Sequence, residues 1–327
     1  MKILVTGVAG FIGSHVAKSL LIEGHEVIGI DNLNNYYDVE LKHARLNSID
    51  KSLKFTFYKL DLTDKDAISG LFKEERFDVV VHLAAQAGVR YGIENPFSYV
   101  DSNLIGMMTI LEGCRHNNIK HLIFASSSSV YGLNKKVPYS EEDKTDSPIS
   151  LYAATKKSNE LISYSYSHLY GLNITGLRFF TVYGPYGRPD MSPYIFTKNI
   201  IENKSIRVFN HGKHKRDFTY IDDVVSGIML VLKNPNKSYK IFNIGNNKPI
   251  ALLRYIEVIE NILGKKAIKN MEPIQAGDVE NTWADIQDIA YLGYSPYTKI
   301  ELGMEKFIKW FVDYHKISDI DIFKHVK

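Results

Sequence analysis

The chain has 327 residues, of which 45% are hydrophobic and 24% charged, and its formal net charge is +3. This is the composition of a globular protein, and so small a net charge gives no reason to expect a nucleic-acid groove or a basic membrane patch. The apolar run at residues 1–6 is too short for a signal peptide, and no stretch approaches the roughly 20 apolar residues of a membrane span. We therefore expect a cytoplasmic protein whose partner is a small molecule.

The first 180 residues alternate short apolar runs with amphipathic stretches. The runs are rich in β-branched residues and predict buried strands, whereas the stretches between them predict helices. In chain order the strands are expected at KILVTG, HEVIGID, LKFTFYKLD, FDVVVHLAA, KHLIFASS and NITGLRF, and the helices at residues 11–23, 38–50, 64–75, 96–116 and 151–170. This alternation predicts an α/β fold with a doubly wound parallel (Rossmann) sheet.

After about residue 180 the pattern breaks into shorter pieces, with strand-like IRVFN and KIFNIG and a final helix at residues 301–316. A chain of this length is long for a single core. We expect a dinucleotide-binding domain over residues 1–180, its sheet completed by parts of 205–245. Residues 181–327 are expected to form mainly a smaller C-terminal α/β substrate lobe.

A glycine pattern follows the first predicted strand, in the stretch GVAGFIGSHV. Gly7, Gly10 and Gly13 lie between that strand and a helix, an order that points unpaired N–H groups at a phosphate. Their spacing differs from the usual Gly-x-Gly-x-x-Gly pattern, so a second signal is needed. Asp31 supplies it about twenty residues on, where a carboxylate binds ribose hydroxyls and repels a 2′-phosphate. The pair predicts NAD rather than NADP, with Asp61 as a candidate for the adenine amine.

The stretch LYAATKKSNE carries a candidate for chemistry. Tyr152 and Lys156 are four residues apart on a predicted helix and so share one face. An ammonium group near a phenol lowers the pKa of the phenol, which would let Tyr152 act as a general base near neutral pH. The preceding strand ends in four serines, FASSSSVYG, where a hydroxyl could bridge the substrate oxygen and the tyrosine.

The segments GVAGFIGSHV, HLAAQAGVR, ASSSSVYG, YAATK, LRFFTVYGP, RDFTYIDD and NTWAD resemble the extended short-chain dehydrogenase/reductase family nearly end to end. Within that family, DNLNNYYDVELKHARL, AAQAGVRY, FFTVYGPYGRPDM and QAGDV are similar to the UDP-glucuronate 4-epimerases. The resemblance implies an isomerase that holds NAD as a recycled cofactor and epimerises a UDP-uronic acid through a transient 4-keto intermediate. It also implies a homodimer, in which the helices at 96–116 and 151–170 form a four-helix bundle with their symmetry mates.

The resemblance further assigns roles to individual residues. Ser127, Tyr152 and Lys156 are implied to be the catalytic hydroxyl, the base and the lysine that orients the cofactor. The implied cofactor-binding residues are Gly7, Gly10, Phe11, Ile12, Gly13, Asp31, Asn32, Asp61, Leu62, Leu83, Ala84, Ala85, Gln86, Asn103, Tyr152, Lys156, Phe179 and Val182. The implied substrate-binding residues are Arg90, Ser127, Ser128, Ser129, Tyr152, Thr181, Arg188, Arg216 and Asp278, with Arg216 as the diphosphate ligand. No pair of residues has the spacing of a metal site.

A uronic acid substrate raises a chemical problem, because its 4-keto form is a β-keto acid. Such an acid loses CO₂ when its C5–C6 bond stands perpendicular to the plane of the ketone. The serines at 127–129 and Thr181 offer neutral donors that could fix the carboxylate, and Arg90 or Arg188 could add positive charge.

Other sugars and other reactions remain open from the sequence. Ser128 and Ser129 stand where sugar dehydratases carry an acidic pair, which argues against dehydration. Thr282 stands where some galactose epimerases carry a tyrosine, and it leaves room for a carboxylate or for an acetamido group. The alternatives are a 4-epimerase of a UDP-N-acetylhexosamine or of its uronic acid, a UDP-glucuronate decarboxylase, and a non-catalytic NAD-binding scaffold.

Overall fold

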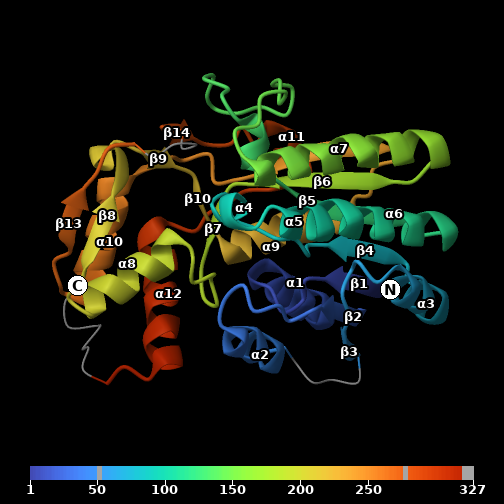
Figure 1. Ribbon diagram of the computed structural model, residues 1–327, viewed down its shortest axis with the longest axis horizontal. Coiled ribbons are helices and arrows are strands. Elements are labelled where there is room, and N and C mark those ends of the chain that lie inside the picture. Colours follow the sequence, from blue (N-terminus) through green and yellow to red (C-terminus); the bar gives the residue numbers. More distant parts are fainter. Residues whose placement is uncertain (50–53, 275–278, 319–327) are drawn as a thin grey trace.

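The computed structural model describes residues 1–49, 54–274 and 279–318. Two parts lie side by side, a large sheet flanked by helices and a smaller group of helices and short strands (Figure 1). Both parts share one hydrophobic core, which runs from the sheet across α1 and α9 to helices α10 and α12 of the smaller part. No helix in the described ranges is long and apolar enough to cross a membrane.

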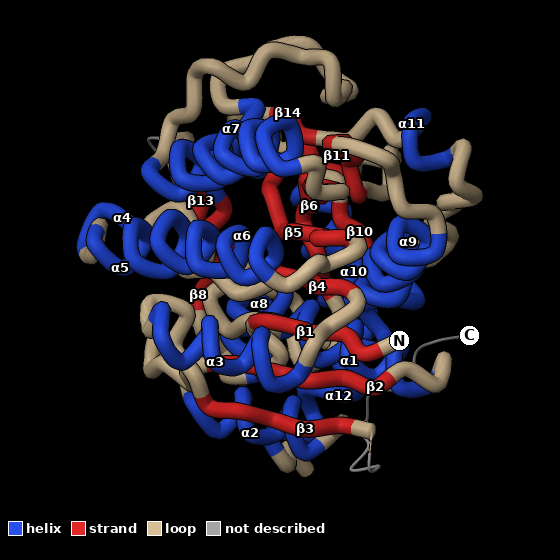
Figure 2. Tube along the Cα trace, turned by 90° about the vertical axis from the view of Figure 1, so that its right-hand side faces the viewer, coloured by secondary structure: helices blue, strands red, loops and turns tan. Residues whose placement is uncertain are grey.

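The large sheet has seven strands in the order β11-β6-β5-β4-β1-β2-β3, and every neighbouring pair is parallel. Figure 2 shows these strands stacked edge to edge, with β3 at the bottom. The strands are β1 Lys2–Thr6, β2 Glu26–Asp31, β3 Phe55–Lys59, β4 Val79–His82, β5 His121–Ser127, β6 Ile174–Phe179 and β11 Tyr239–Ile244. The doubly wound parallel sheet predicted from the first 180 residues is confirmed, and β11 completes it at the edge beside β6.

Helices cover both faces of this sheet, so its central strands are buried apolar runs. On one face α1 (Phe11–Ile22) packs against α9 (Ile221–Lys233). On the other face α3 (Lys65–Glu75), α6 (Gly106–His116) and α7 (Leu151–Tyr170) lie next to one another. Because the helices exclude water from both faces, the side chains of the strands reach solvent mainly at the strand ends.

The helix expected at residues 96–116 is present, but it is not α-helical throughout. It consists of α5 (Phe97–Tyr99), the π-helical turn η1 (Val100–Ile105) and α6. Asn103 lies in the π-helical turn with its side chain buried and bonded to the main chain of Gln86. The irregular turn therefore provides a bond between η1 and the segment after β4, which apolar periodicity does not reveal.

The smaller part is built from α8 (Ser192–Ile201), α10 (Leu252–Leu263) and α12 (Ile300–His315). Of these only α12 is among the predicted helices. The IRVFN run forms β8 (Ser205–Val208), which pairs with β13 (Ile268–Met271) and not with the large sheet. The other described elements are α2 Val39–Asn47, α4 Tyr91–Glu94, η2 Ser128–Tyr131, β7 Thr181–Tyr183, η3 Phe209–Gly212, β9 Lys215–Arg216, β10 Phe218–Tyr220, β12 Ile250–Ala251, β14 Asn281–Thr282 and α11 Gln287–Ala290. The boundary placed at residue 180 stays a prediction.

Candidate active site

The crevice of a doubly wound sheet lies where the strand order reverses, here between the carboxyl ends of β1 and β4. Gly7 follows β1 and meets the segment after β4. Its φ of +68° is in the left-handed region, and a Cβ there would lie 2.8 Å from the main-chain atoms of Ala84. Only glycine lets these two strand ends approach so closely.

The same turn leads directly into α1. A Cβ on Gly13 would lie 2.1 Å from the carbonyl oxygen of Gly7, so the helix packs on the turn without space for a side chain. Gly10 is the N-cap, and no side chain caps the helix. The first N–H groups of a helix have no intrahelical partner, and here they include those of Phe11 and Ile12. The turn therefore fits a pyrophosphate.

Two carboxylates stand beyond this turn. Asp31, at the end of β2, accepts hydrogen bonds from the N–H groups of Ala9 (3.2 Å) and Leu33 (2.9 Å). Asp61 is exposed and accepts bonds from Asn32 (2.8 Å) and Thr63. Each carboxylate oxygen has further lone pairs, so the donor groups of an adenosine fit beside Asp31 and the Asn32–Asp61 pair. This arrangement and the glycine turn together suit a dinucleotide.

The other predicted cofactor residues line the strand ends. Leu62, Phe179 and Val182 are buried, whereas Leu83, Ala84 and Ala85 are partly exposed after β4. Asn103 is buried, and its amide bonds both main-chain groups of Gln86 and the hydroxyl of Thr155. In this structure Asn103 thus fastens the segment after β4 to helix α7.

The serines at the end of β5 form a compact group. Ser127 caps the short helix η2, where its Oγ accepts from the N–H of Ser129 and donates to the Oγ of Ser129, both at 3.1 Å. Ser128 and Ser129 are partly exposed, while Ser127 is buried. The group presents neutral hydroxyls at the carboxyl edge of the sheet.

Tyr152 and Lys156 face these serines from the first turns of α7. Burial raises the pKa of the Tyr152 phenol, and a hydrogen bond with Ser127 and the positive charge of Arg188 lower it. Lys156 lies beside Tyr152 and binds the main chain. Its Nζ lies 6.0 Å from the centre of the Tyr152 ring and donates to the carbonyl of Ala125 at 2.7 Å. Burial lowers the pKa of Lys156 to about 8, so it loses its proton more readily than a lysine in water.

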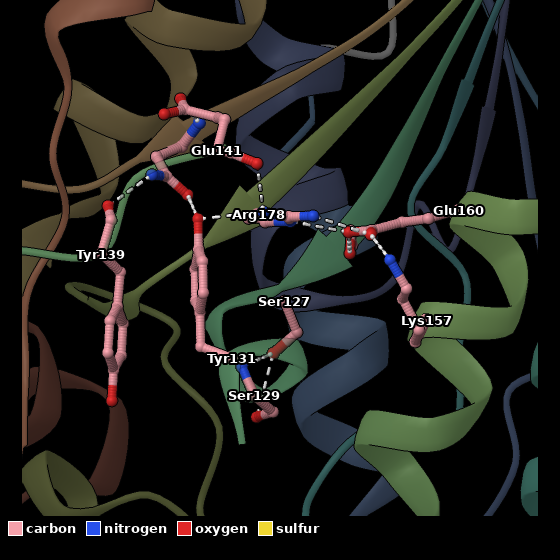
Figure 3. A network of polar contacts seen from close by, with 10 residues as sticks. Ser127, Ser129, Tyr131, Tyr139, Glu141, Lys157, Glu160 and Arg178 are labelled. Atoms are coloured by element: carbon pink, nitrogen blue, oxygen red, sulfur yellow. Dashed lines mark hydrogen bonds and ion pairs between the residues drawn. The ribbon is translucent and has the colours of Figure 1, made fainter. Parts of the chain in front are cut away.

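A buried polar network behind the serines holds α7 against the sheet (Figure 3). Arg178 on β6 binds both carboxylate oxygens of Glu160 on α7, at 2.8 and 2.9 Å. Glu160 also accepts from Ser126, and the guanidinium of Arg178 reaches the hydroxyl of Tyr131. Asn243 on β11 closes the network through a 2.7 Å bond from Tyr131. The positions of the serines and of α7 are therefore linked through side chains that lie out of the solvent.

The loop between β7 and α8 brings Arg188 to the site. Its guanidinium pairs with Asp190 through bonds of 2.9 and 2.6 Å, and Tyr36 donates to the same carboxylate at 3.1 Å. Arg90 is exposed and lies over the ring of Phe209, with 5.6 Å from its Cζ to the ring centre. Only Arg188 of these two arginines acts on the charge of Tyr152.

The smaller part contributes Thr181 and Arg216. Thr181 begins β7, and its N–H donates to the carbonyl of Asp217 at 3.1 Å. The guanidinium of Arg216 bonds the carbonyl oxygens of Val279 (2.7 Å) and Glu280 (2.8 Å). Asp278, the last predicted substrate residue, lies outside the described residues.

Several residues that shape the site were absent from the prediction. Asp190 and Tyr36 set the position of Arg188, and Glu160 and Arg178 set that of α7. The sequence did hold a signal for Glu160, because it lies four residues after Lys156 on a predicted helix and an acidic residue on a buried face needs a partner. No comparable signal links Tyr36 to Asp190, which are 154 residues apart.

Comparisons with known proteins show what the whole chain is similar to. A family model described as the NAD dependent epimerase/dehydratase family matches residues 3–245. Protein CapI of Staphylococcus aureus is 53% identical over 97% of this chain and 100% of its own length. UDP-glucuronate 4-epimerase 4 of Arabidopsis thaliana is 48% identical over 96% of this chain and 76% of its own. A crystal structure of UDP-glucuronic acid 4-epimerase from Bacillus cereus with UDP-glucuronic acid and NAD is 37% identical, with a TM-score of 0.91, and the match covers 96% of this chain and 100% of that one.

The contact between Gly13 and Gly7 gives a test of the turn. We expect Gly13→Ala to lower the free energy of unfolding by about 1–3 kcal/mol, because the added methyl group meets a main-chain oxygen that has no room to move. Gly70→Ala is the matched control, since a Cβ at this exposed position in α3 meets nothing within 4 Å. It should raise the free energy of unfolding by about 0.5–1 kcal/mol. Urea unfolding measures both, and equal effects of the two changes would contradict the packing argument.

Proposed function

The chain belongs to the NAD dependent epimerase/dehydratase family, and on this premise we propose that it interconverts UDP-glucuronate and UDP-galacturonate by inverting C4 of the sugar. The observation that carries the proposal is the meeting of Tyr152, Ser127 and Arg188 at the carboxyl edge of a dinucleotide crevice. A base, a neutral hydroxyl and a cation in this place suit oxidation of a sugar hydroxyl beside an acidic group.

NAD is the cofactor of this reaction, and the glycine turn, the N-terminus of α1 and Asp31 would hold it. When bound, it supplies the reversible hydride acceptor that allows C4 to pass through a ketone. Gly7, Gly13 and Asp31 would fix the position of the bound dinucleotide.

The side chains of α7 and β5 handle the proton. Tyr152 takes the proton of the sugar 4-hydroxyl and later returns it, which requires the phenol to be ionised at working pH. The nearby hydroxyl of Ser127 and the charge of Arg188 favour that form, whereas burial opposes it. Lys156 is held by the carbonyl of Ala125, at a place where its ammonium group can bind a ribose hydroxyl.

The carboxylate of the sugar needs a fixed position, because a β-keto acid loses CO₂ when its C5–C6 bond turns out of the ketone plane. We assign Ser127, Ser128, Ser129 and Thr181 as neutral donors for this group. The serines already form an ordered cluster at the end of β5, and Thr181 stands at the start of β7 with its main chain bonded. Donors that are fixed before the sugar binds restrict rotation at low entropic cost.

Removing the phenolic hydroxyl tests the base. We expect Tyr152→Phe to lower turnover of UDP-glucuronate by about two to four orders of magnitude, as loss of a general base does. NAD binding should survive. Tyr164→Phe, at an exposed position of the same helix, is the control and should retain the parent rate. Turnover near the parent value in Tyr152→Phe would remove Tyr152 from the mechanism.

Asp31→Ala tests the assignment of the ribose ligand. The change should weaken NAD binding and reduce discrimination against NADP, because the carboxylate that binds ribose hydroxyls and repels a 2′-phosphate is lost. Fluorescence titration with both dinucleotides measures the preference. Asp66→Ala, at an exposed site in α3, should leave it unchanged. An unaltered preference in Asp31→Ala means that other groups recognise the ribose.

Thr181→Val tests the grip on the carboxylate, since it deletes one hydroxyl and keeps the volume of the side chain. With UDP-glucuronate we expect slower epimerisation, release of CO₂ and a new pentose-type product. Chromatography with mass detection measures both products. Thr56→Val, at an exposed position on the edge strand β3, should behave like the parent. If the parent converts UDP-glucose or UDP-N-acetylglucosamine faster than UDP-glucuronate, the assignment of a uronate is wrong.

We also propose that the protein is a cytoplasmic homodimer that serves polysaccharide biosynthesis. Exposed apolar residues on α5 and α7, such as Phe97 and Leu161, support an interface between symmetry-related copies of these helices. The single cysteine is a buried free thiol, consistent with a reducing compartment.

Light scattering at micromolar concentration should give twice the mass of the chain, and a monomer would refute the dimer.

A further inference from the structure

Among the described residues, Arg45 is the largest side chain that is fully buried, with 0% of its surface exposed. It lies on α2, and it forms no ion pair with any residue in the described part of the chain. Removing a guanidinium from water without a carboxylate partner is strongly unfavourable unless hydrogen bonds replace its hydration. The hydrogen bonds of the Arg45 guanidinium must therefore replace the water that burial removes from it.

The guanidinium bonds three separate segments. Nη1 donates to the carbonyl of Ala9 at 3.1 Å, within the glycine turn, and to the hydroxyl of Tyr37 at 2.5 Å. Nε and Nη2 both donate to the carbonyl of Tyr186, at 3.0 and 2.8 Å. Arg45 thus joins the glycine turn to the loop between β7 and α8, and it lies 141 residues before Tyr186 in the chain.

Tyr186 has an unusual main-chain conformation, with a φ of +62°. A left-handed backbone is unfavourable for a residue with a Cβ, and such strain persists only where surrounding contacts hold it. The two bonds from Arg45 supply such contacts. Arg188, whose charge lowers the pKa of Tyr152, follows Tyr186 by two residues. The carbonyl group that Arg45 holds therefore lies close in the chain to the arginine that reaches the active site.

A second contact ties the same two segments together. Tyr36, which precedes α2, donates to Asp190 at 3.1 Å, and Asp190 pairs with Arg188. The segment between β2 and α2 directly follows Asp31, the predicted ribose ligand at the end of β2. One face of this segment therefore meets the cofactor turn, and the other meets the loop that carries Arg188.

We propose that Arg45 is a positioning residue that couples the dinucleotide site to the nucleotide-sugar site through the loop at residues 184–190. The proposal rests on the proposed function for the identity of the two ligands. A ligand that orders the loop around Arg188 also holds Tyr186 against Arg45, and through Arg45 it holds the turn at Ala9. Coupling of this kind is reciprocal, so occupancy of the sugar site should slow release of NAD.

The experiment measures NAD dissociation from the loaded protein, with and without saturating UDP, using an excess of an NAD-consuming dehydrogenase as a trap. In the parent, UDP should slow release by about fivefold or more, a usual size for coupling between sites. In Arg45→Met this factor should fall below about twofold. Arg254→Met, which removes an exposed arginine on α10, should keep the parent factor. The proposal is overturned if Arg45→Met keeps the parent factor, or if UDP has no effect on the parent.

A second variant covers the case in which Arg45→Met does not fold. Tyr36→Phe deletes one exposed hydroxyl bond and leaves the buried charge in place. It should reduce the UDP factor by about twofold without lowering the melting temperature, whereas a merely structural contact would alter stability and leave the factor unchanged. An unchanged factor in Tyr36→Phe contradicts the coupling. If the parent binds UDP but does not convert UDP-glucuronate, the proposed reaction is refuted. The factor by which UDP slows NAD release can still be measured in that case, so the two proposals are tested separately.

Discussion

The buried ion pair between Arg178 and Glu160 is the interaction on which the active-site geometry depends. The guanidinium belongs to β6 and the carboxylate to α7, each is 3% exposed, and two bonds below 3 Å join them. Removing one partner of such a pair leaves a buried charge and typically costs about 3–5 kcal/mol, so α7 is strongly held in one register on the sheet. Tyr152 and Lys156 lie on the same helix, and Ser126 binds the same carboxylate. The Arg178–Glu160 pair, which lies behind the active site, therefore fixes the distance between Tyr152 and the serines.

A second buried carboxylate sets the other side of the site. Asp217 is 0% exposed and accepts bonds from the N–H groups of Asn246, Asn247 and Ala284 and from the hydroxyl of Thr219. These donors come from three segments that meet where the sheet joins the smaller part. The carbonyl of Asp217 also accepts from Thr181. Each half of the site is thus positioned by a buried carboxyl group whose hydrogen bonds replace water.

Local chemistry made much of the fold predictable. The six strands of the first 180 residues and the helix at 151–170 lie where apolar periodicity placed them, because a sheet covered on both faces needs continuous apolar runs. Helix α9 was not predicted, although its exposed Asp222, Ser226 and Lys233 are spaced along one face and its other faces are buried against α1 and the sheet. The π-helical turn at Asn103 was also missed, because a hydrogen bond to Gln86 and not an apolar face accounts for it.

The sequence by itself determined the parallel sheet, the glycine turn with Asp31, and the pairing of Tyr152 with Lys156 on one helix. These features depend on spacing along a single strand, turn or helix, and such spacing is fixed by local backbone geometry. Only the tertiary structure decided that Lys156 binds Ala125 and that Arg188 acts on Tyr152. It also decided that Arg45 joins Ala9 to Tyr186. These contacts link residues dozens to more than a hundred positions apart, and a buried polar group takes whichever partner the packed chain brings within reach, which no local pattern encodes.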